Sequence, residues 1–303
     1  MERINLEEYQ YAGEGANGMS YVSRTNPGEM LKIYNTTFPV EKISVELESA
    51  RKLYRLGVPT PEPGELVTDG ERIGIRFQRI AGKRSYSRMF ADEPERTDEL
   101  AREMAGYCKY LHSIPAPEGM FTSAREQYLQ MLKADRTMTG EEHRKMEYFI
   151  QNMPETRTLL QGDMHFGNII STLPKGAPLT EPHNVYFIDL ESVAYGHPFC
   201  DLGMMMCICL LSDEEFRVHD FHVDGRQTRL IWESFIDEYF FAEDRLADKL
   251  IGPGQTPGSV EKAIVPFACV KFLLVGSNLN GIIPPHYYDF LRKNLLGVMP
   301  SVG

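Results

Sequence analysis

The sequence predicts an α+β protein of two lobes, in which a small β-rich lobe with one main helix precedes a larger, mostly helical lobe. Two observations lead to this expectation. Strand-like segments and reversal signals fill the first eighty residues, whereas long helical patterns dominate beyond Gly82. The change of pattern indicates a hinge near residues 78–83, so we expect one lobe over residues 1–81 and the other over residues 82–303.

Four segments of the first lobe have the strand pattern, and one has the helical pattern. The predicted strands are residues 19–24, 29–34, 65–69 and 72–80. The turn Asn26-Pro27-Gly28 joins the first two strands. A helix is predicted over residues 39–55, and the prolines that follow it end it, because proline has no N–H and restricts the residue before it.

Apolar side chains recur at helical spacing through most of the second lobe, and this pattern predicts seven long helices. They cover about residues 95–113, 122–134, 140–152, 199–211, 226–247, 258–277 and 285–296. Short apolar pairs on both sides of residues 161–168 have the strand pattern instead. A polar loop between short strands is a typical place for functional side chains.

Composition and charge exclude several classes of function. The chain has 43 acidic and 32 basic residues and a net charge of −11, which disfavours nucleic acid or an anionic membrane as a partner. Its five cysteines form no CxxC pair, no apolar run is long enough to span a bilayer, and the polar start is unlike a signal peptide. We therefore expect a reduced, soluble, cytoplasmic protein.

The segment Gln161-Gly162-Asp163-Met164-His165-Phe166-Gly167-Asn168 carries the strongest chemical signal. Asp163 and Asn168 are five residues apart, close enough for one loop to hold both over a shared ligand. Asp189 follows 21 residues after Asn168, at the end of the apolar strand-like segment 185–188. An amide oxygen and a carboxylate suit Mg²⁺, which takes a few protein oxygens and fills its octahedron with water and phosphate.

These residues resemble the GDxHxxN loop and the metal-binding strand of the aminoglycoside phosphotransferase and choline kinase families, relatives of the protein kinases. The segment FIDLESVAYGHPFCDLG, which contains Asp189 and Asp201, is similar to that strand and to the Asp-Leu-Gly after it. The resemblance implies a protein-kinase-like fold and a phosphotransferase that uses ATP with Mg²⁺. It implies that Asp163 orients the attacking hydroxyl and accepts its proton, and that Asn168 and Asp189 hold the metal.

The same resemblance assigns supporting roles to three more residues. His165 and Asp201 would brace the loop without binding metal, and Glu191 would face the acceptor site or a second metal. Gln161 departs from the family pattern, which commonly has His-Gly-Asp at this point. Since that histidine mainly packs and forms hydrogen bonds, an amide is expected to replace it with some change of local geometry.

Gly13, Gly15 and Gly18 match the pattern GxGxxG, which has two explanations. A dinucleotide-binding fold requires a helix directly after the glycines and an acidic residue about 20 positions later. Here the glycines lead into a strand-like segment, and residues 33–38 contain no acid. The pattern therefore favours a kinase-type loop between strands, whose backbone N–H groups bind phosphate oxygens.

Lys32, in the second predicted strand, is the expected phosphate-binding lysine. Its acidic partner should lie on the following helix, where Glu48 is chosen for its spacing to the Val58-Pro59-Thr60-Pro61 segment and Glu46 is the alternative. Gln78 and Ile80, at the end of the last strand, are expected to present backbone groups to adenine.

The acceptor is expected to be a small molecule. Only eleven residues separate Asp189 from Asp201, and no Ala-Pro-Glu follows, whereas protein kinases use a longer segment there to bind peptides. Aromatic and acidic residues after residue 225 suggest a cage for an amine, although each one alone is better explained as core. They are Trp232, Glu233, Asp237, Glu238, Tyr239, Phe240, Phe241, Tyr287 and Tyr288.

Two other functions fit parts of the pattern. A nucleotide-binding module that has lost catalysis would keep the same fold, but Lys32, Asp163, Asn168 and Asp189 are all present. A metal-dependent phosphoesterase would explain Gly162-Asp163 with His165 nearby, but the eight histidines show no grouping of the kind that such sites need. The choice between ATP and GTP, and between choline-like, aminoglycoside and sugar-like acceptors, stays open.

Overall fold

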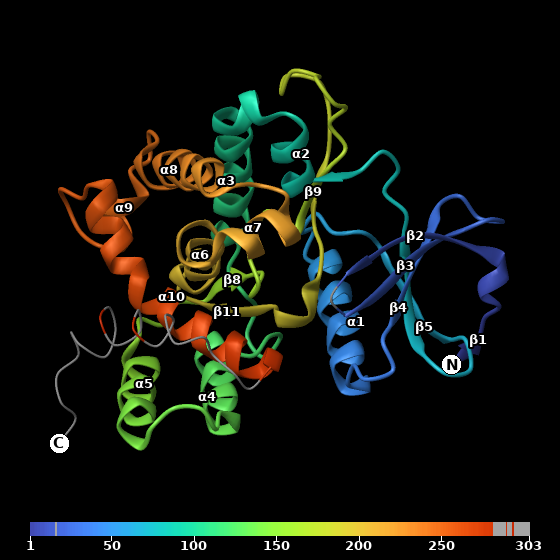
Figure 1. Cartoon of the computed structure of the whole chain (residues 1–303), viewed down its shortest axis with the longest axis horizontal. Coiled ribbons are helices and arrows are strands. Elements are labelled where there is room, and N and C mark those ends of the chain that lie inside the picture. Colours follow the sequence, from blue (N-terminus) through green and yellow to red (C-terminus); the bar gives the residue numbers. More distant parts are fainter. Residues whose placement is uncertain (16, 281–288, 290–292, 294–303) are drawn as a thin grey trace. The chain divides into compact units, whose positions relative to one another are not determined.

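The computed structural model describes residues 1–15, 17–280, 289 and 293 (Figure 1). Contacts divide the chain into two compact units. The first comprises Met1–Ser85 and Asn168–Val193, and the second comprises Tyr86–Gly167 and Ala194–Gly303. The first unit thus ends within four residues of the predicted boundary, but it also takes in residues 168–193, which the sequence placed in the second lobe.

A six-stranded sheet forms the first part of the first unit, in the order β1-β5-β6-β4-β3-β2. Its strands are β1 (Glu2–Arg3), β2 (Tyr9–Gly15), β3 (Gly18–Ser23), β4 (Glu29–Tyr34), β5 (Pro63–Thr68) and β6 (Ile73–Gln78). The short helix η1 (Leu6–Glu8) connects β1 to β2. All four predicted strands are present, and β3 and β4 form the predicted antiparallel hairpin.

Helix α1 (Val40–Arg55) packs against β5 and β6, as its apolar stripe requires (Figure 1). Ile43 and Leu47 are buried with Tyr34 and Ile75 of the sheet. Three short strands complete the first unit, β7 (Arg84–Ser85), β9 (Ile169–Ser171) and β10 (Val185–Phe187), followed by the 3₁₀ helix η3 (Leu190–Ser192). Because η3 also contacts α1, this segment belongs to the first unit despite its late position in the sequence.

The second unit is mostly helical, as predicted. Its helices are α2 (Tyr86–Asp92), η2 (Pro94–Arg96), α3 (Thr97–Ser113), α4 (Ala124–Ala134), α5 (Gly140–Asn152), α6 (Phe199–Met206), the π-helix η4 (Cys207–Leu211), α7 (Glu214–Phe221), α8 (Gly225–Phe241), α9 (Leu246–Leu250) and α10 (Pro257–Asn280). A two-stranded sheet pairs β8 (Thr158–Leu160) with β11 (Ala194–Gly196). Helix α3 packs against α8, and α6 packs against α10.

One predicted helix needs correction, and another lies outside the described residues. The pattern over residues 226–247 predicts one helix, but α8 ends at Phe241 because Ala242 has an extended ψ of 180°, which a right-handed helix cannot include. A separate short helix, α9, begins after Arg245, whose φ is +43°. The predicted helix 285–296 lies outside the described residues. Helices α2 and α7 were not predicted, since each has only seven or eight residues and gives little periodic signal.

Two of the predicted helices, α4 and α5, begin at capping boxes. Ser123 and Glu126 form a capping box at α4, and Thr139 and Glu142 form another at α5, so that backbone N–H groups of the first turn are satisfied.

Within the described chain, no helix is both long enough and apolar enough to cross a membrane. All five cysteines are buried as free thiols.

Candidate active site

Lys32 on β4 forms an ion pair with Glu46 on α1, within the first unit. Its Nζ lies 2.9 Å from Glu46 Oε1 and 3.1 Å from Oε2. The predicted partner, Glu48, is wrong: its side chain is 58% exposed and contacts Arg51 at 3.4 Å. Two helical positions separate Glu46 from Glu48, which turns the second carboxylate about 200° away from the face that meets the sheet.

The sequence held a signal for the correct partner. Glu46 stands three residues after Ile43 and four before Ala50, on the same buried stripe of α1. An acidic residue on an apolar stripe is costly to bury unless it is paired, so its position itself predicts a cationic partner. The spacing to the proline segment, which favoured Glu48, carried no such physical requirement.

Tyr34, two residues after Lys32, also binds Glu46 and was not predicted as a site residue. Its hydroxyl donates to Glu46 Oε2 at 2.6 Å in a fully buried setting. Burial raises the pKa of Glu46, and the charge of Lys32 only partly offsets that effect. Burial lowers the pKa of Lys32, but Asp189 and Glu46 outweigh it and keep the ammonium charged.

Asp189 contacts Lys32 directly, so Lys32, Tyr34, Glu46 and Asp189 form one group, hereafter the Lys32 cluster. Asn168 and Asp189 lie at the same end of the β9–β10 ladder, since Ile169 pairs with Phe187 and the Ile188 N–H donates to Asn168 O at 3.0 Å. Asn168 is buried, whereas the Asp189 side chain is 48% exposed. Asp189 has a φ of +55°, which turns the chain sharply into η3.

Glu191 lies in η3 near the Lys32 cluster and is half-buried. Burial, and then the charge of Glu46, raises its pKa. The charges of Lys32 and Lys42 oppose this shift, so Glu191 has both acidic and basic side chains near it. Among the described residues, no group of three or more His, Cys, Asp and Glu side chains is arranged to hold a metal by itself.

The three glycines of the GxGxxG pattern lie in the β2–β3 hairpin. Gly13 and Gly15 are in β2, and Gly15 pairs with Gly18 at the start of β3. A Cβ at Gly18 would lie 2.2 Å from Ile33 O, so β3 and β4 can approach this closely only with glycine there. The glycine segment thus lies between two strands, without a helix after it.

Gln78 ends β6, and Ile80 is buried beyond it. The Gln78 N–H donates to Glu62 O at 2.8 Å, and the next N–H, of Arg79, donates to Gly28 O at 2.8 Å. The N–H groups of Gln78 and Arg79 are therefore both engaged within the first unit. The predicted adenine contacts of Gln78 and Ile80 stay predictions.

Residues 161–167, hereafter the Asp163 loop, are anchored inside the second unit. Asp201 on α6 is fully buried and accepts from the N–H groups of Gln161 and Gly162, each at 2.8 Å. His112 Nε2 lies 3.0 Å from the same carboxylate. These contacts are those of a brace: one carboxylate holds two consecutive peptide groups at the base of the loop.

The backbone of the loop changes direction at Gly162, directly before the partly exposed Asp163. Gly162 has a φ of +84°, a left-handed conformation that favours glycine. Gln161 Oε1 accepts from the Asp163 N–H at 2.7 Å, so the amide performs a hydrogen-bonding role at the position where the family pattern has histidine. Asp163 Oδ2 lies 3.7 Å from His165 Nε2, and the Asp163 side chain is 33% exposed.

Lys271 on α10 reaches the same loop and was not predicted. Its Nζ donates to Gly162 O at 2.6 Å and lies 3.9 Å from Asp163 Oδ1. The side chain is only 6% exposed. Lys271 follows the loop by more than a hundred residues, and its position on an apolar helix indicates only that it needs a partner, without identifying the Asp163 loop as that partner.

A comparison with protein families identifies the family of this chain. The family model described as "Phosphotransferase enzyme family" matches residues 9–233, well over half of the chain. The chain belongs to this family. A search of curated proteins found no match to the sequence.

Solved structures with the same fold include members of both predicted families. They include an ADP-bound aminoglycoside phosphotransferase APH(2'')-Ib (16% identity, 95% of this chain and 92% of that chain covered, TM-score 0.52) and the streptomycin–ATP complex of APH(2'')-IIa (18%, 96% and 92%, 0.52). A choline/ethanolamine kinase family protein from Mesorhizobium loti also matches (14%, 95% and 86%, 0.50). At these identities the likeness concerns the fold, and it confirms the predicted kinase-like α+β architecture.

Three of the aromatic residues considered for an amine cage belong to the core of this phosphotransferase. Trp232, Tyr239 and Phe240 are fully buried. The Trp232 indole N–H donates to Glu261 at 2.7 Å, and the Tyr239 hydroxyl lies 2.6 Å from His112 Nδ1. These three side chains therefore form no open cage, and Tyr287 and Tyr288 lie outside the described residues.

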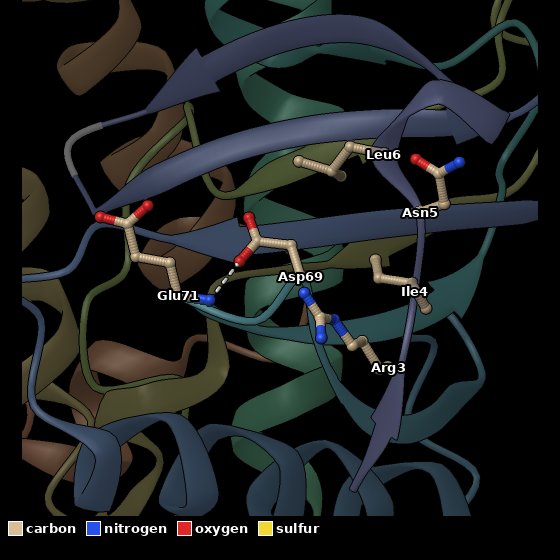
Figure 2. Close-up of a pocket in the computed structure, with 6 residues that line it drawn as sticks. All are labelled: Arg3, Ile4, Asn5, Leu6, Asp69 and Glu71. Atoms are coloured by element: carbon tan, nitrogen blue, oxygen red, sulfur yellow. Dashed lines mark hydrogen bonds between the residues drawn. The ribbon is translucent and has the colours of Figure 1, made fainter.

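A pocket on the first unit contains none of the predicted site residues. Figure 2 shows it beside β1 and the turn between β5 and β6, where the Glu71 N–H donates to Asp69 Oδ1 at 2.9 Å. Its lining is Arg3, Ile4, Asn5, Leu6, Asp69 and Glu71. The Asp69 carboxylate already accepts hydrogen bonds from Arg72 and from the turn N–H groups. We therefore interpret the pocket as a feature of the turn.

Proposed function

We propose that this protein transfers the γ-phosphate of ATP to a hydroxyl group of a small metabolite, with Mg²⁺ as cofactor. The observation that carries the proposal is the Asp163 loop. In a chain of the phosphotransferase family, it presents a partly exposed carboxylate on a backbone held by Asp201, Gln161 and Lys271. Phosphoryl transfer depends mainly on positioning and on charge, and a rigidly held carboxylate meets the first need.

The Lys32 cluster is the nucleotide side of the proposal. Lys32 would exchange part of its contact with Asp189 for phosphate oxygens while Glu46 and Tyr34 keep its position. The β2–β3 hairpin with Gly13, Gly15 and Gly18 would contribute N–H groups to the phosphates, and Gln78 and Ile80 would contact adenine. The pairing of Lys32 with two carboxylates supports this role, because it keeps the ammonium charged in a buried place.

Asn168 and Asp189 are the residues that would hold Mg²⁺. Both offer hard oxygen donors, and they lie side by side at one end of the β9–β10 ladder, which fits the needs of the ion. When bound, Mg²⁺ neutralises charge on the phosphates. Glu191 is proposed to face the acceptor or a second cation, in line with the carboxylates around it.

The reaction needs one proton acceptor, and Asp163 is proposed for it. The acceptor hydroxyl gives its proton to Asp163 as its oxygen forms a bond to the γ-phosphorus, and the bond from that phosphorus to the leaving oxygen of ADP breaks. The products are a phosphate ester and ADP, and the proton then passes from Asp163 to water. His165, 3.7 Å from the carboxylate, is proposed to help orient it.

A small acceptor is favoured over a protein, because only eleven residues separate Asp189 from Asp201. The similar solved structures are titled as enzymes for aminoglycosides or for choline and ethanolamine. We therefore propose an amino alcohol, an aminoglycoside or a sugar-like alcohol as the acceptor class. The expectations of a cytoplasmic location and of no nucleic-acid or membrane partner stay predictions.

The test is to incubate the purified protein with Mg²⁺, ATP or GTP, and a panel of these alcohols, and to measure ADP or GDP and the phosphate ester. Asp163→Asn serves as the inactive control. Nucleotide-dependent ester formation by the wild type alone would support the proposal. A rise in melting temperature with ATP but no turnover would favour the module without catalysis, and the absence of both effects would refute nucleotide use altogether.

A further inference from the structure

Lys271 is a buried cation, and within the described part of the chain its hydrogen bond and its ion pair both go to the Asp163 loop. The ammonium donates to the carbonyl of Gly162 at 2.6 Å, and the carboxylate of Asp163 lies 3.9 Å away. A buried charge is stable only when it is paired and hydrogen-bonded. A lysine in this place therefore needs these two contacts, and the loop in turn has a fixed cation beside its carboxylate.

The helix that carries Lys271 is fixed against the helix that carries Asp201. A Cβ at Gly203 of α6 would lie 2.8 Å from the backbone N of Ala268 in α10, so the two helices cross in very close contact. Asp201 and Lys271 therefore keep a constant spacing. Because their backbones cannot separate without losing this packing, they act on the loop as one rigid support.

Side chains of helices α6 and α10 form hydrogen bonds with both backbone polar groups of one loop residue, Gly162. The Gly162 N–H donates to Asp201, and the Gly162 carbonyl accepts from Lys271. That carbonyl belongs to the peptide group that leads into Asp163. Its orientation sets the direction in which the Asp163 side chain leaves the backbone, and the nearby ammonium attracts the carboxylate toward one rotamer.

We propose that Lys271 is a positioning residue for Asp163 and that it acts on phosphoryl transfer and not on nucleotide binding. The effect on transfer rests on the proposed function, whereas the effect on the loop does not. A small misplacement of a reacting group lowers a rate strongly, while ATP affinity depends on groups of the first unit. The loss should therefore appear in kcat.

Three variants test the proposal. Lys271→Met removes the charge and the donor at similar volume, and Lys271→Arg restores a cation that can reach the carbonyl. Lys262→Met is the matched control, because Lys262 lies on α10 but is exposed. Lys271→Met should lower kcat about 30-fold with KM for ATP changed less than about twofold, and Lys271→Arg should recover most of the loss.

Amide hydrogen exchange gives a readout that needs no turnover. Lys271→Met should speed exchange at the N–H groups of Gln161, Gly162 and Asp163, because the peptide group beside them loses its anchor. Lys262→Met should leave these rates unchanged. Unchanged exchange in Lys271→Met, or an unchanged kcat in an active enzyme, would overturn the proposal. If the wild type turns over no acceptor, the proposed function fails, and the exchange measurement alone decides the role of Lys271 in the loop.

Discussion

A buried lysine stands beside a carboxylate in each of the two units, and the two lysines bind different kinds of partner. Lys32 contacts the carboxylates of Glu46 and Asp189. Lys271 donates to the backbone carbonyl of Gly162 and lies 3.9 Å from the Asp163 carboxylate. Their side chains are 16% and 6% exposed.

The difference separates a binding role from a positioning role. A lysine shared between two carboxylates can exchange one of them for a phosphate and remain paired. It therefore suits a site where a charged ligand binds and dissociates. A lysine bound to a loop carbonyl has no such exchange available without releasing the loop. We therefore expect changes in the Lys32 cluster to affect nucleotide affinity, and changes around the Asp163 loop to affect turnover or folding stability.

The largest expected effect is at Asp163. Asp163→Asn keeps the side-chain shape but removes the proton acceptor, so kcat should fall about a thousandfold while the Kd for ATP stays the same. Steady-state kinetics and calorimetric titration would measure the two quantities. Asp220→Asn, an exposed carboxylate of the same unit, is the control. If ATP affinity fell in parallel with kcat, the separation of roles between the two lysines would be wrong.

Asp201 tests whether the base of the loop is a structural brace. Three donors converge on this fully buried carboxylate, and an amide in Asp201→Asn would direct its own NH₂ at one of them. We expect a loss of about 3 kcal/mol in the free energy of unfolding, measured by urea denaturation at neutral pH. A loss below about 1 kcal/mol would show that the loop does not depend on this carboxylate.

His197 gives the second unit a pH dependence of its own. Burial, and then the charge of His112, lowers the pKa of His197 from 6.5 to about 4. The unfolded chain therefore binds a proton near pH 6.5, but the folded chain does so only near pH 4. Stability should fall as the pH falls through this window, by at most about 3 kcal/mol.

The measurement for His197 is the free energy of unfolding between pH 7 and pH 4. His197→Asn should flatten the profile, since an amide oxygen can still accept from the Phe199 N–H that now donates to Nδ1 at 3.3 Å. His219→Asn is the control, because the His219 side chain is 83% exposed. Equal slopes in the two variants would assign the pH dependence to other groups.

The smallest expected effect distinguishes two neighbouring carboxylates on α1. Glu46→Gln should lower kcat/KM for ATP about 30-fold, because Lys32 loses one of its two charged partners. Glu48→Gln should change the same ratio by less than about twofold, because Glu48 is exposed and pairs with Arg51 on the same helix. If Glu48→Gln were as damaging, the observed ion pair would not be the functional one.

Local patterns made much of this protein predictable. The alternation of β3 and β4 around Asn26-Pro27-Gly28, the amphipathic α1 and the order of Asp163, Asn168 and Asp189 are all short-range features of the sequence. Each depends on a turn residue, a periodicity or a motif spacing within a few tens of residues. Such features identified the family and the α+β fold.

Other features could not be predicted from the sequence, because they depend on the contacts and the backbone conformations that form after folding. Glu48 was chosen over Glu46 from spacing, although burial on the α1 stripe decides which carboxylate meets Lys32. The end of α8 at Phe241 depends on the extended backbone conformation of Ala242. Trp232 and Tyr239 look like ligand-binding aromatics until their burial is known.

By itself, the sequence determined the phosphotransferase family and the two-part architecture, and it supplied the residues that are proposed for the chemistry. Only the tertiary structure decided which partners those residues have: Glu46 and Tyr34 for Lys32, and Asp201 and Lys271 for the Asp163 loop. The physical reason is the distance along the sequence between the residues that determine each feature. Turns and helices follow from neighbours in the chain, whereas a buried charge is placed by whichever distant element packing brings within hydrogen-bond distance.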